Sequence, residues 1–118
     1  MTSRAELVRK YYGAYQQRDR KTLEDGLTDD FTFTSPYDDK IDKASYFERC
    51  WPNSQRMKLS LEQIALQGDE AFVRYRCVTP EGKEFRNTEF LTFRGDAIAT
   101  VDVYFGATYL HGDFVKQA

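Results

Sequence analysis

Glu89 is the residue whose type and position point most clearly to chemistry. In residues 85–93 the two-residue period of a β-strand places alternate side chains on one face, which carries Phe85, Asn87, Glu89, Leu91 and Phe93. A carboxyl group among apolar side chains is costly to bury, because desolvation penalises its charged form. Glu89 therefore predicts either a partner for its carboxyl group or a pocket that contains water or a ligand.

The other reactive residue types form no second constellation. His111 is the only histidine, and a role for it in a pocket requires that the C-terminal tail fold across the pocket mouth. Cys50 and Cys77 lie among apolar residues, as buried free thiols do, and make no metal motif. Asp29 and Asp30 have no third ligand beside them. We therefore expect neither a metal ion nor a cofactor.

The composition indicates one folded domain, residues 1–118, with 41% hydrophobic and 15% aromatic residues. The aromatic surplus suits a lined cavity, an aromatic core or an interface. The 17 basic and 19 acidic residues are interspersed and give a net charge of -2, so there is no basic footprint for nucleic acid. No apolar run reaches the roughly 20 residues that span a bilayer, and the N-terminus has no apolar signal core. We expect a cytoplasmic protein without membrane contact.

The elements that must position Glu89 begin with three helices. Ser3 and Glu6 form a capping-box pattern, and apolar residues then recur at helical spacing, which predicts a helix over 3–18. Asp19 can cap a second helix over 20–27, which Gly26 weakens near its end. Asp42 can cap a third helix over 43–51, ended by Pro52.

Strands make up most of the remaining chain. Residues 31–35 alternate and stop at Pro36, and turn signals then separate strands at about 58–66, 70–79, 84–94 and 97–106. The short connections require antiparallel neighbours, so these four strands form a meander. The apolar parity changes near Glu62 and Gln63, which predicts a β-bulge that curls the sheet. The fold class is therefore α+β, with three N-terminal helices packed on a strongly curved, mainly antiparallel sheet around a cavity.

Strand parity separates two faces. Matching apolar positions places Val73, Tyr75 and Cys77 beside Phe85, Asn87 and Glu89, and these beside Ala99, Val101, Val103 and Phe105. The opposite face carries Phe72, Phe90 and Tyr104 together with Arg74, Arg76, Arg86 and Asp102. A second subunit could cover that face as a two-fold homodimer, with the arginines pairing with carboxylates such as Asp102. The alternative is an amphipathic solvent face with scattered aromatic residues.

This order of elements resembles the nuclear transport factor 2-like superfamily, which includes SnoaL-like polyketide cyclases and ketosteroid isomerases and has a cystatin-like, cone-shaped α+β barrel. The resemblance extends from Leu7 to Phe105, and its motifs are residues 18–27, 28–36, 85–89, 95–98 and 103–106. It implies a single SnoaL-like domain with an internal pocket.

The resemblance also implies roles for individual residues. In ketosteroid isomerases an aspartate acts as general base opposite a tyrosine and a protonated acid. Counting back from Arg18 and Asp19 places the tyrosine at Tyr11, and the protonated acid falls at Glu89. The base position carries Ser35, whose hydroxyl is too weakly basic without an activating neighbour. We therefore do not expect efficient ketosteroid isomerase activity.

Two functions stay open on these grounds. Glu89, assisted by Tyr11 or Tyr75, can catalyse proton transfer of isomerase, cyclase or dehydratase type on an apolar carbonyl or hydroxyl compound. Alternatively, the same cavity binds a small apolar molecule without turnover, or the domain is a dimeric interaction module. Each residue also has a purely structural interpretation as core or as part of a buried polar network. The predicted ligand-binding residues are Tyr15, Phe33, Ser35, Phe47, Trp51, Tyr75, Asn87, Leu91, Val101, Val103 and Phe105.

Overall fold

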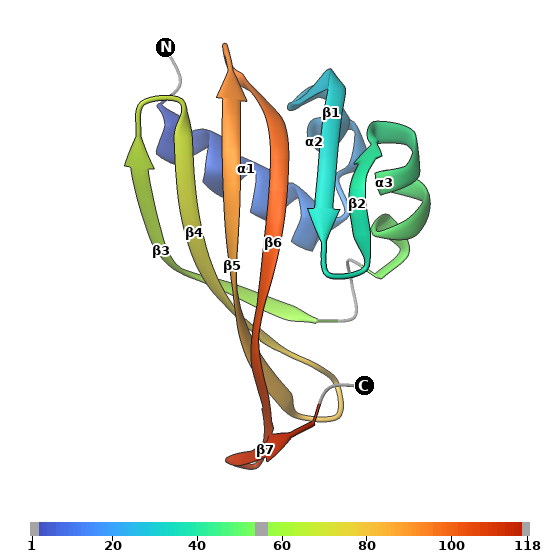
Figure 1. The fold of residues 1–118 in the computed structure, drawn as a ribbon, viewed down its shortest axis with the longest axis vertical. Coiled ribbons are helices and arrows are strands. Elements are labelled where there is room, and N and C mark those ends of the chain that lie inside the picture. The colour runs from blue at the N-terminus through green and yellow to red at the C-terminus, as the bar shows by residue number, and fades with distance from the viewer. Residues whose placement is uncertain (1–2, 54–56, 117–118) are drawn as a thin grey trace.

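A computed structural model describes residues 3–53 and 57–116. The helices are α1 (Arg4–Gln17), α2 (Arg20–Asp25) and α3 (Lys43–Arg49), with a 3-10 helix, η1 (Trp51–Asn53). The strands are β1 (Leu27–Ser35), β2 (Asp38–Asp42), β3 (Lys58–Gln67), β4 (Glu70–Val78), β5 (Lys83–Arg94), β6 (Ala97–Leu110) and β7 (Asp113–Val115). Helix α1 crosses one face of the curved sheet, and α3 lies beside β1 and β2 (Figure 1). The predicted α+β fold is confirmed. Within the described ranges, no helix is long and apolar enough to cross a membrane.

Short polar side chains begin each helix at the predicted residue. The capping oxygens of Ser3, Asp19 and Asp42 accept hydrogen bonds from the backbone N–H groups of Glu6, Thr22 and Ser45 at 3.1, 3.2 and 2.9 Å. Helices α2 and α3 end earlier than predicted, at Asp25 and Arg49. Gly26 is the C-cap of α2. Pro52 disfavours helical backbone at the residue before it, so α3 gives way to a 3-10 turn.

The sheet has the order β2-β1-β6-β5-β4-β3, with β7 paired to β6. The predicted antiparallel meander from β3 to β6 is confirmed. Two strands were not predicted, because β2 (Asp38–Asp42) is rich in charge and β7 has only three residues. The β1–β6 pair is parallel. This pairing joins the N-terminal half of the chain to the meander.

The register confirms the predicted parity of the strands. Glu89 lies opposite Val73 on β4 and opposite Val103 on β6. The predicted bulge is present between Leu61 and Gln63, so Glu62 is the extra residue of β3. A second irregularity lies between Phe105 and Thr108 of β6, where Gly106 has no room for a side chain because a Cβ would overlap the carbonyl oxygen of Arg86. These two irregularities locally interrupt the regular pairing.

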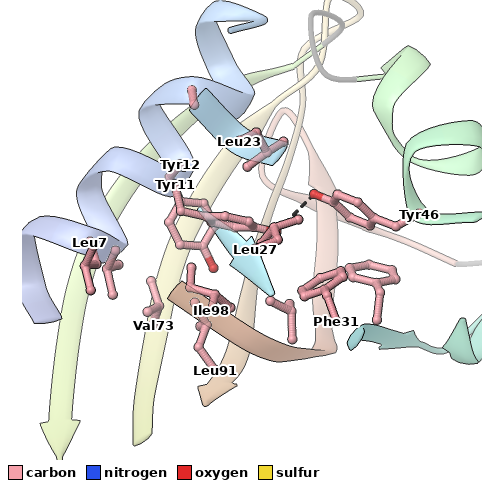
Figure 2. Packing of buried hydrophobic residues seen from close by; sticks show 14 of the residues in the cluster. Leu7, Tyr11, Tyr12, Leu23, Leu27, Phe31, Tyr46, Val73, Leu91 and Ile98 are labelled. Atoms are coloured by element: carbon pink, nitrogen blue, oxygen red, sulfur yellow. Dashed lines mark hydrogen bonds between the residues drawn. The ribbon is translucent and has the colours of Figure 1, made fainter. Parts of the chain in front are cut away.

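The core fills the inner face of the sheet at the end where α1, α2 and β1 meet (Figure 2). Its fully buried side chains come from all layers and include Val8, Leu23, Phe31, Tyr46, Val73, Leu91 and Val101. Large inner-face residues nearer the β4–β5 turn are less enclosed, because Phe85 is half-buried and Phe105 is 39% exposed. The inner face is therefore packed at one end and more open at the other.

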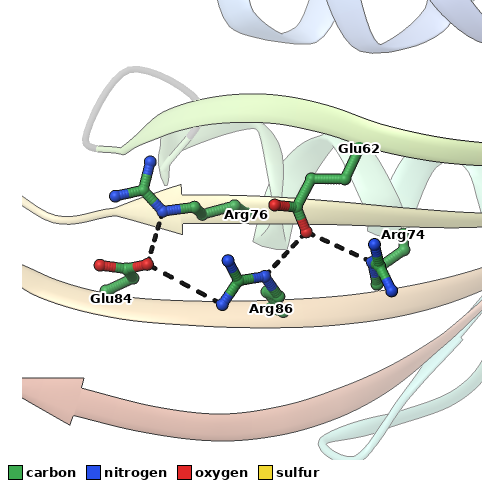
Figure 3. A network of polar contacts seen from close by, with 5 residues as sticks. All are labelled: Glu62, Arg74, Arg76, Glu84 and Arg86. Atoms are coloured by element: carbon green, nitrogen blue, oxygen red, sulfur yellow. Dashed lines mark hydrogen bonds and ion pairs between the residues drawn. The ribbon is translucent and has the colours of Figure 1, made fainter. Parts of the chain in front are cut away.

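The outer face carries a continuous chain of ion pairs (Figure 3). Glu62 Oε1 accepts a hydrogen bond from Arg86 Nε at 2.8 Å and lies 3.3 Å from Arg74 Nε. Glu84 bridges Arg76 at 2.5 Å and Arg86 at 3.9 Å. Within one chain the arginines thus pair with Glu62 and Glu84, and pairing with Asp102 across a dimer contact stays a prediction. Glu62 follows Ser60 by two positions on β3, and Ser60 pairs with Arg76, so alternation places both on the face of the arginines.

Beside this network, the rings of Phe72 and Phe90 pack at 4.9 Å between centroids, and Phe72 and Tyr104 are 52% and 57% exposed. We expect this aromatic face to form a two-fold contact with a second copy, because its arginines are already paired with carboxylates of the same chain. Sedimentation at micromolar concentration should show a dimer, and Phe72→Glu should raise its dissociation constant by at least about tenfold. Leu66→Glu, an exposed residue of the other face, is the control. A clean monomer of the unmodified protein contradicts the prediction.

Candidate functional site

Glu89 lies inside the protein and is held by two tyrosines from different layers. Its side chain is 6% exposed. Tyr12 on α1 donates a hydrogen bond to Oε1 at 2.6 Å, and Tyr75 on β4 donates to Oε2 at 2.5 Å. Each carboxyl oxygen therefore has one phenolic donor and keeps a further lone-pair position for another partner. The carboxyl group joins the helix layer to the sheet.

A chain of hydrogen bonds orients Tyr75. Asn87 Nδ2 donates to the Tyr75 hydroxyl at 3.1 Å, and Asn87 Oδ1 accepts from the backbone N–H of Gly106 at 3.3 Å. Asn87 is 6% exposed, so both ends of its amide are used inside the protein. The bulge at Gly106 brings that N–H to the amide. The irregular part of β6 is thereby connected to the carboxyl group through Asn87 and Tyr75.

Compared with water, the site stabilises the neutral form of the Glu89 carboxyl group relative to its ionised form. Burial raises the pKa of Glu89, and the hydrogen bonds from Tyr12 and Tyr75 lower it by less, so that the pKa is raised overall. Burial and the Glu89 carboxyl also raise the pKa values of Tyr12 and Tyr75. Both tyrosines therefore remain protonated donors at neutral pH, while Glu89 is the group that can change its protonation state.

Glu89 faces a cavity of about 680 Å³, within the roughly 300–1,000 Å³ of small-molecule sites. Nine of the residues singled out from the sequence line it, namely Tyr11, Tyr15, Phe33, Ser35, Tyr75, Asn87, Glu89, Val103 and Phe105. Four predicted ligand-binding residues lie instead in the packed core, namely Phe47, Trp51, Leu91 and Val101. Leu91 and Val101 pair on adjacent strands at the packed end, and Phe47 and Trp51 pack on each other at 5.9 Å between ring centroids.

The two adjacent tyrosines of α1 have different partners. Tyr12 contacts Glu89, whereas the hydroxyl of Tyr11 shares a hydrogen bond with that of Tyr46 at 3.0 Å (Figure 2). Counting along the sequence selected Tyr11, and both residues belong to the same apolar stripe of the helix. The partner of the carboxyl on α1 was therefore missed, whereas its partner on β4, Tyr75, had been predicted. Tyr12 and Tyr46 also line the cavity.

The cavity lining contains a second carboxyl group, which the sequence did not suggest. Asp38 lines the cavity beside Ser35 and pairs with Arg49 Nη1 at 2.6 Å. Ser35 Oγ accepts a hydrogen bond from the backbone N–H of Tyr37 at 3.1 Å. His111 lies in the β6–β7 turn and is not among the lining residues. The C-terminal segment instead contributes Val115 and Lys116 to the lining.

Replacing Tyr11 and Tyr12 one at a time separates their roles. Tyr12→Phe removes a hydrogen bond that lowers the pKa of Glu89, so that pKa should rise further. Unfolding free energy at neutral pH should fall by about 1–3 kcal/mol, because a buried carboxyl loses a donor. Tyr11→Phe is the control, since Tyr11 bonds to Tyr46. Titration of the Glu89 carboxyl carbon by NMR measures both variants. A larger effect of Tyr11→Phe would contradict the assignment.

Glu89→Gln tests the raised pKa by linkage. Above the unfolded-state value near 4.5, the wild-type protein should lose stability relative to Gln as pH rises to the folded pKa, and the full loss should persist above it. The unfolding free energy of both proteins, measured by urea denaturation at several pH values, should therefore show the Gln variant gaining stability relative to the wild type as the pH rises. Glu62→Gln is the control of opposite sign, because Arg86 lowers the pKa of Glu62. If the Glu89→Gln variant instead loses stability relative to the wild type as the pH rises, Glu89 is an ionised structural partner.

Comparison with known proteins gives a family and a fold. The family model described as SnoaL-like domain matches residues 8–101. Among curated proteins, none matches the sequence of this chain. A nuclear transport factor 2-like protein of unknown function from Cytophaga hutchinsonii is 18% identical, with a TM-score of 0.72 over 89% of this chain and 91% of that chain.

Two further solved structures share the fold. A protein from Kribbella flavida, described as a candidate ketosteroid isomerase, has a TM-score of 0.76 at 17% identity, covering 87% of this chain and 77% of that chain. A candidate polyketide cyclase from Sinorhizobium meliloti has a TM-score of 0.67 at 19% identity, covering 84% of this chain and 94% of that chain. At these identities the likeness concerns the fold alone. Because the family model covers most of the sequence, the chain belongs to the SnoaL-like domain family, and it shares the fold of a nuclear transport factor 2-like protein.

Proposed function

We propose that this protein binds a small, largely apolar molecule in its cavity and that Glu89 transfers a proton to or from a carbonyl or hydroxyl group of that molecule. The observation that carries the proposal is one carboxyl group, 6% exposed, held by phenolic donors at 2.6 and 2.5 Å and facing a cavity of about 680 Å³. The reaction class is proton transfer of the isomerase, cyclase or dehydratase type.

The chemistry follows from the two protonation states of Glu89. The ionised carboxylate has lone pairs left over from Tyr12 and Tyr75 and can accept a proton from the ligand. The neutral acid can donate a proton or a hydrogen bond to a ligand oxygen. A pKa raised by burial brings the two states closer in free energy at neutral pH, which suits a general acid or base. Tyr12 and Tyr75 hold the carboxyl in place in either state.

Known relatives are consistent with this reaction class. Proteins of similar fold include one described as a candidate ketosteroid isomerase and one described as a candidate polyketide cyclase. Both names refer to reactions in which protons move on carbon next to a carbonyl group. The chain differs from the isomerase pattern at the base position, where it has Ser35, so we do not propose ketosteroids as its substrates.

A second candidate function is binding without turnover. The observation that favours it is the state of the cavity's other carboxyl: Asp38 is engaged by Arg49 at 2.6 Å, while Ser35 is occupied as a turn acceptor. Enzymes of this chemistry commonly use two groups with separated pKa values. A ligand carrier needs only the cavity and the hydrogen bonds of Glu89.

Proton exchange of an apolar ketone distinguishes the two candidates. We expect the protein to accelerate the exchange of the α-protons of 2-tetralone into D2O, followed by NMR, because Glu89 can remove a proton next to the carbonyl. Glu89→Gln should reduce that acceleration by about 10²–10⁴, the usual contribution of a positioned acid or base. Saturation-transfer NMR in the same samples measures binding independently.

Phe72→Glu is the control, because Phe72 lies on the outer face away from the cavity. It should retain the exchange activity. Binding of 2-tetralone with exchange at the buffer rate would favour the carrier. The absence of binding to the unmodified protein would contradict both candidates for this ligand class.

A further inference from the structure

The two ends of the cavity differ in charge. Lys83, Phe85, Asn87 and Glu89 alternate along β5, whose pairing with β4 is regular, so all four share the inner face. Lys83 precedes Glu89 by six positions, which is about 20 Å of strand at roughly 3.3 Å per residue. Lys83 lines the cavity as Glu89 does. One inner row of β5 therefore carries a buried carboxyl at one end and an ammonium group at the other.

A second lysine reaches the same end. Val115 on β7 pairs with Thr108 on β6, and Thr108 pairs with Phe85 on β5, so the end of β7 lies level with the start of β5. Lys116 follows Val115 directly, and both line the cavity. A hydrogen-bonded turn precedes β5, in which Thr79 Oγ1 accepts a hydrogen bond from the backbone N–H of Lys83 at 3.0 Å. Lys83 and Lys116 therefore both line the part of the cavity that lies beside the start of β5 and the end of β7.

These lysines keep positive charge at the mouth. Among the residues that the structure describes, five charged side chains line the cavity, namely Asp38, Arg49, Lys83, Glu89 and Lys116. Arg49 and Asp38 neutralise each other at 2.6 Å. The carboxylate of Glu81 lies 3.9 Å from Lys83 Nζ and is exposed, so it offsets that charge weakly. Between the two ends the wall is mainly apolar and includes Leu59, Cys77 and Phe85.

The orientation of an anionic ligand follows from these charges. An anion beside Glu89 would meet a second carboxyl group in a dry environment, which is unfavourable unless one of the two is protonated. At the mouth, an anion remains partly hydrated and lies near two ammonium groups. A ligand with one anionic and one neutral polar end therefore places the neutral end at Glu89.

We propose that the cavity binds an elongated apolar monocarboxylate, with its carboxylate between Lys83 and Lys116 and a hydroxyl or carbonyl oxygen at the far end on Glu89. This inference rests on the proposed function, because it takes the same cavity as the binding site. Lys83 and Lys116 determine specificity, and Glu89 remains the group that exchanges protons. The substrate class is a hydroxy acid or keto acid with an apolar chain between its two polar groups.

A matched pair of compounds tests the proposal by calorimetry. 10-Hydroxydecanoate and 1,10-decanediol share the chain and the hydroxyl end, and differ only in the carboxylate. We expect the acid to bind about two- to twentyfold more tightly at low ionic strength, from two partly exposed ion pairs, and the preference to shrink in high salt. The double variant Lys83→Gln/Lys116→Gln should bind the acid and the diol with equal affinity. Its affinity for the diol should equal that of the unmodified protein.

Two further variants separate this inference from the proposed function. Lys21→Gln should keep the preference for the acid, because Lys21 lies on α2 outside the cavity lining. Glu89→Gln should change the affinities of both compounds by a similar factor, since both place a hydroxyl there. Equal binding of acid and diol by the unmodified protein, or a preference that survives in the double lysine variant, overturns the inference alone. Binding of neither compound also overturns this inference, whereas the proposed function is decided separately by the exchange experiment with 2-tetralone.

Discussion

The structure depends on the burial of one carboxyl group. Glu89 cannot lie on the inner face of β5 without donors, because an unsatisfied buried carboxylate is very costly. Its two donors come from α1 and from β4, so the same interaction that satisfies the acid also fixes how the helix lies on the sheet. Asn87 and Gly106 extend this constraint into β6. Packing and site chemistry are therefore set by one connected group of hydrogen bonds.

Curvature of the sheet determines how much of the inner face the helices can cover. The bulges at Glu62 and Gly106 interrupt regular pairing at different points of the sheet, while the helices pack chiefly over one end. Side chains at the far end then line a cavity instead of a core. On the outer face, Glu62 of β3 pairs with Arg74 of β4 and Arg86 of β5 and so joins three strands.

Stability and function oppose each other at Glu89. A pKa raised by burial means that the ionised form destabilises the fold, and a protein selected for stability alone would have an apolar or amide side chain there. The surrounding tyrosines reduce that cost but do not remove it. Retaining the acid is therefore consistent with a use for its proton, and the opposite charge at the cavity mouth is consistent with a ligand that has two unlike ends.

The sequence by itself determined the features that depend on local pattern. Helix starts at Ser3, Asp19 and Asp42 follow from side-chain capping, and the inward direction of Glu89 follows from strand parity. Both patterns act over a few residues. The sequence did not predict the charge-rich strand β2 or the short strand β7, because neither shows enough alternation of apolar and polar residues.

Only the tertiary structure decided which distant residues meet. Tyr11 and Tyr12 lie on one helical stripe, and the choice between them as partner of Glu89 depends on how α1 rotates against β4 and β5. The parallel β1–β6 pair, and the core packing that keeps Leu91 and Val101 out of the cavity, likewise join segments far apart in the chain. The placement of Lys83 and Lys116 in the lining of one cavity has the same origin. Such contacts depend on the relative position of whole elements, which the periodicity of each element does not encode.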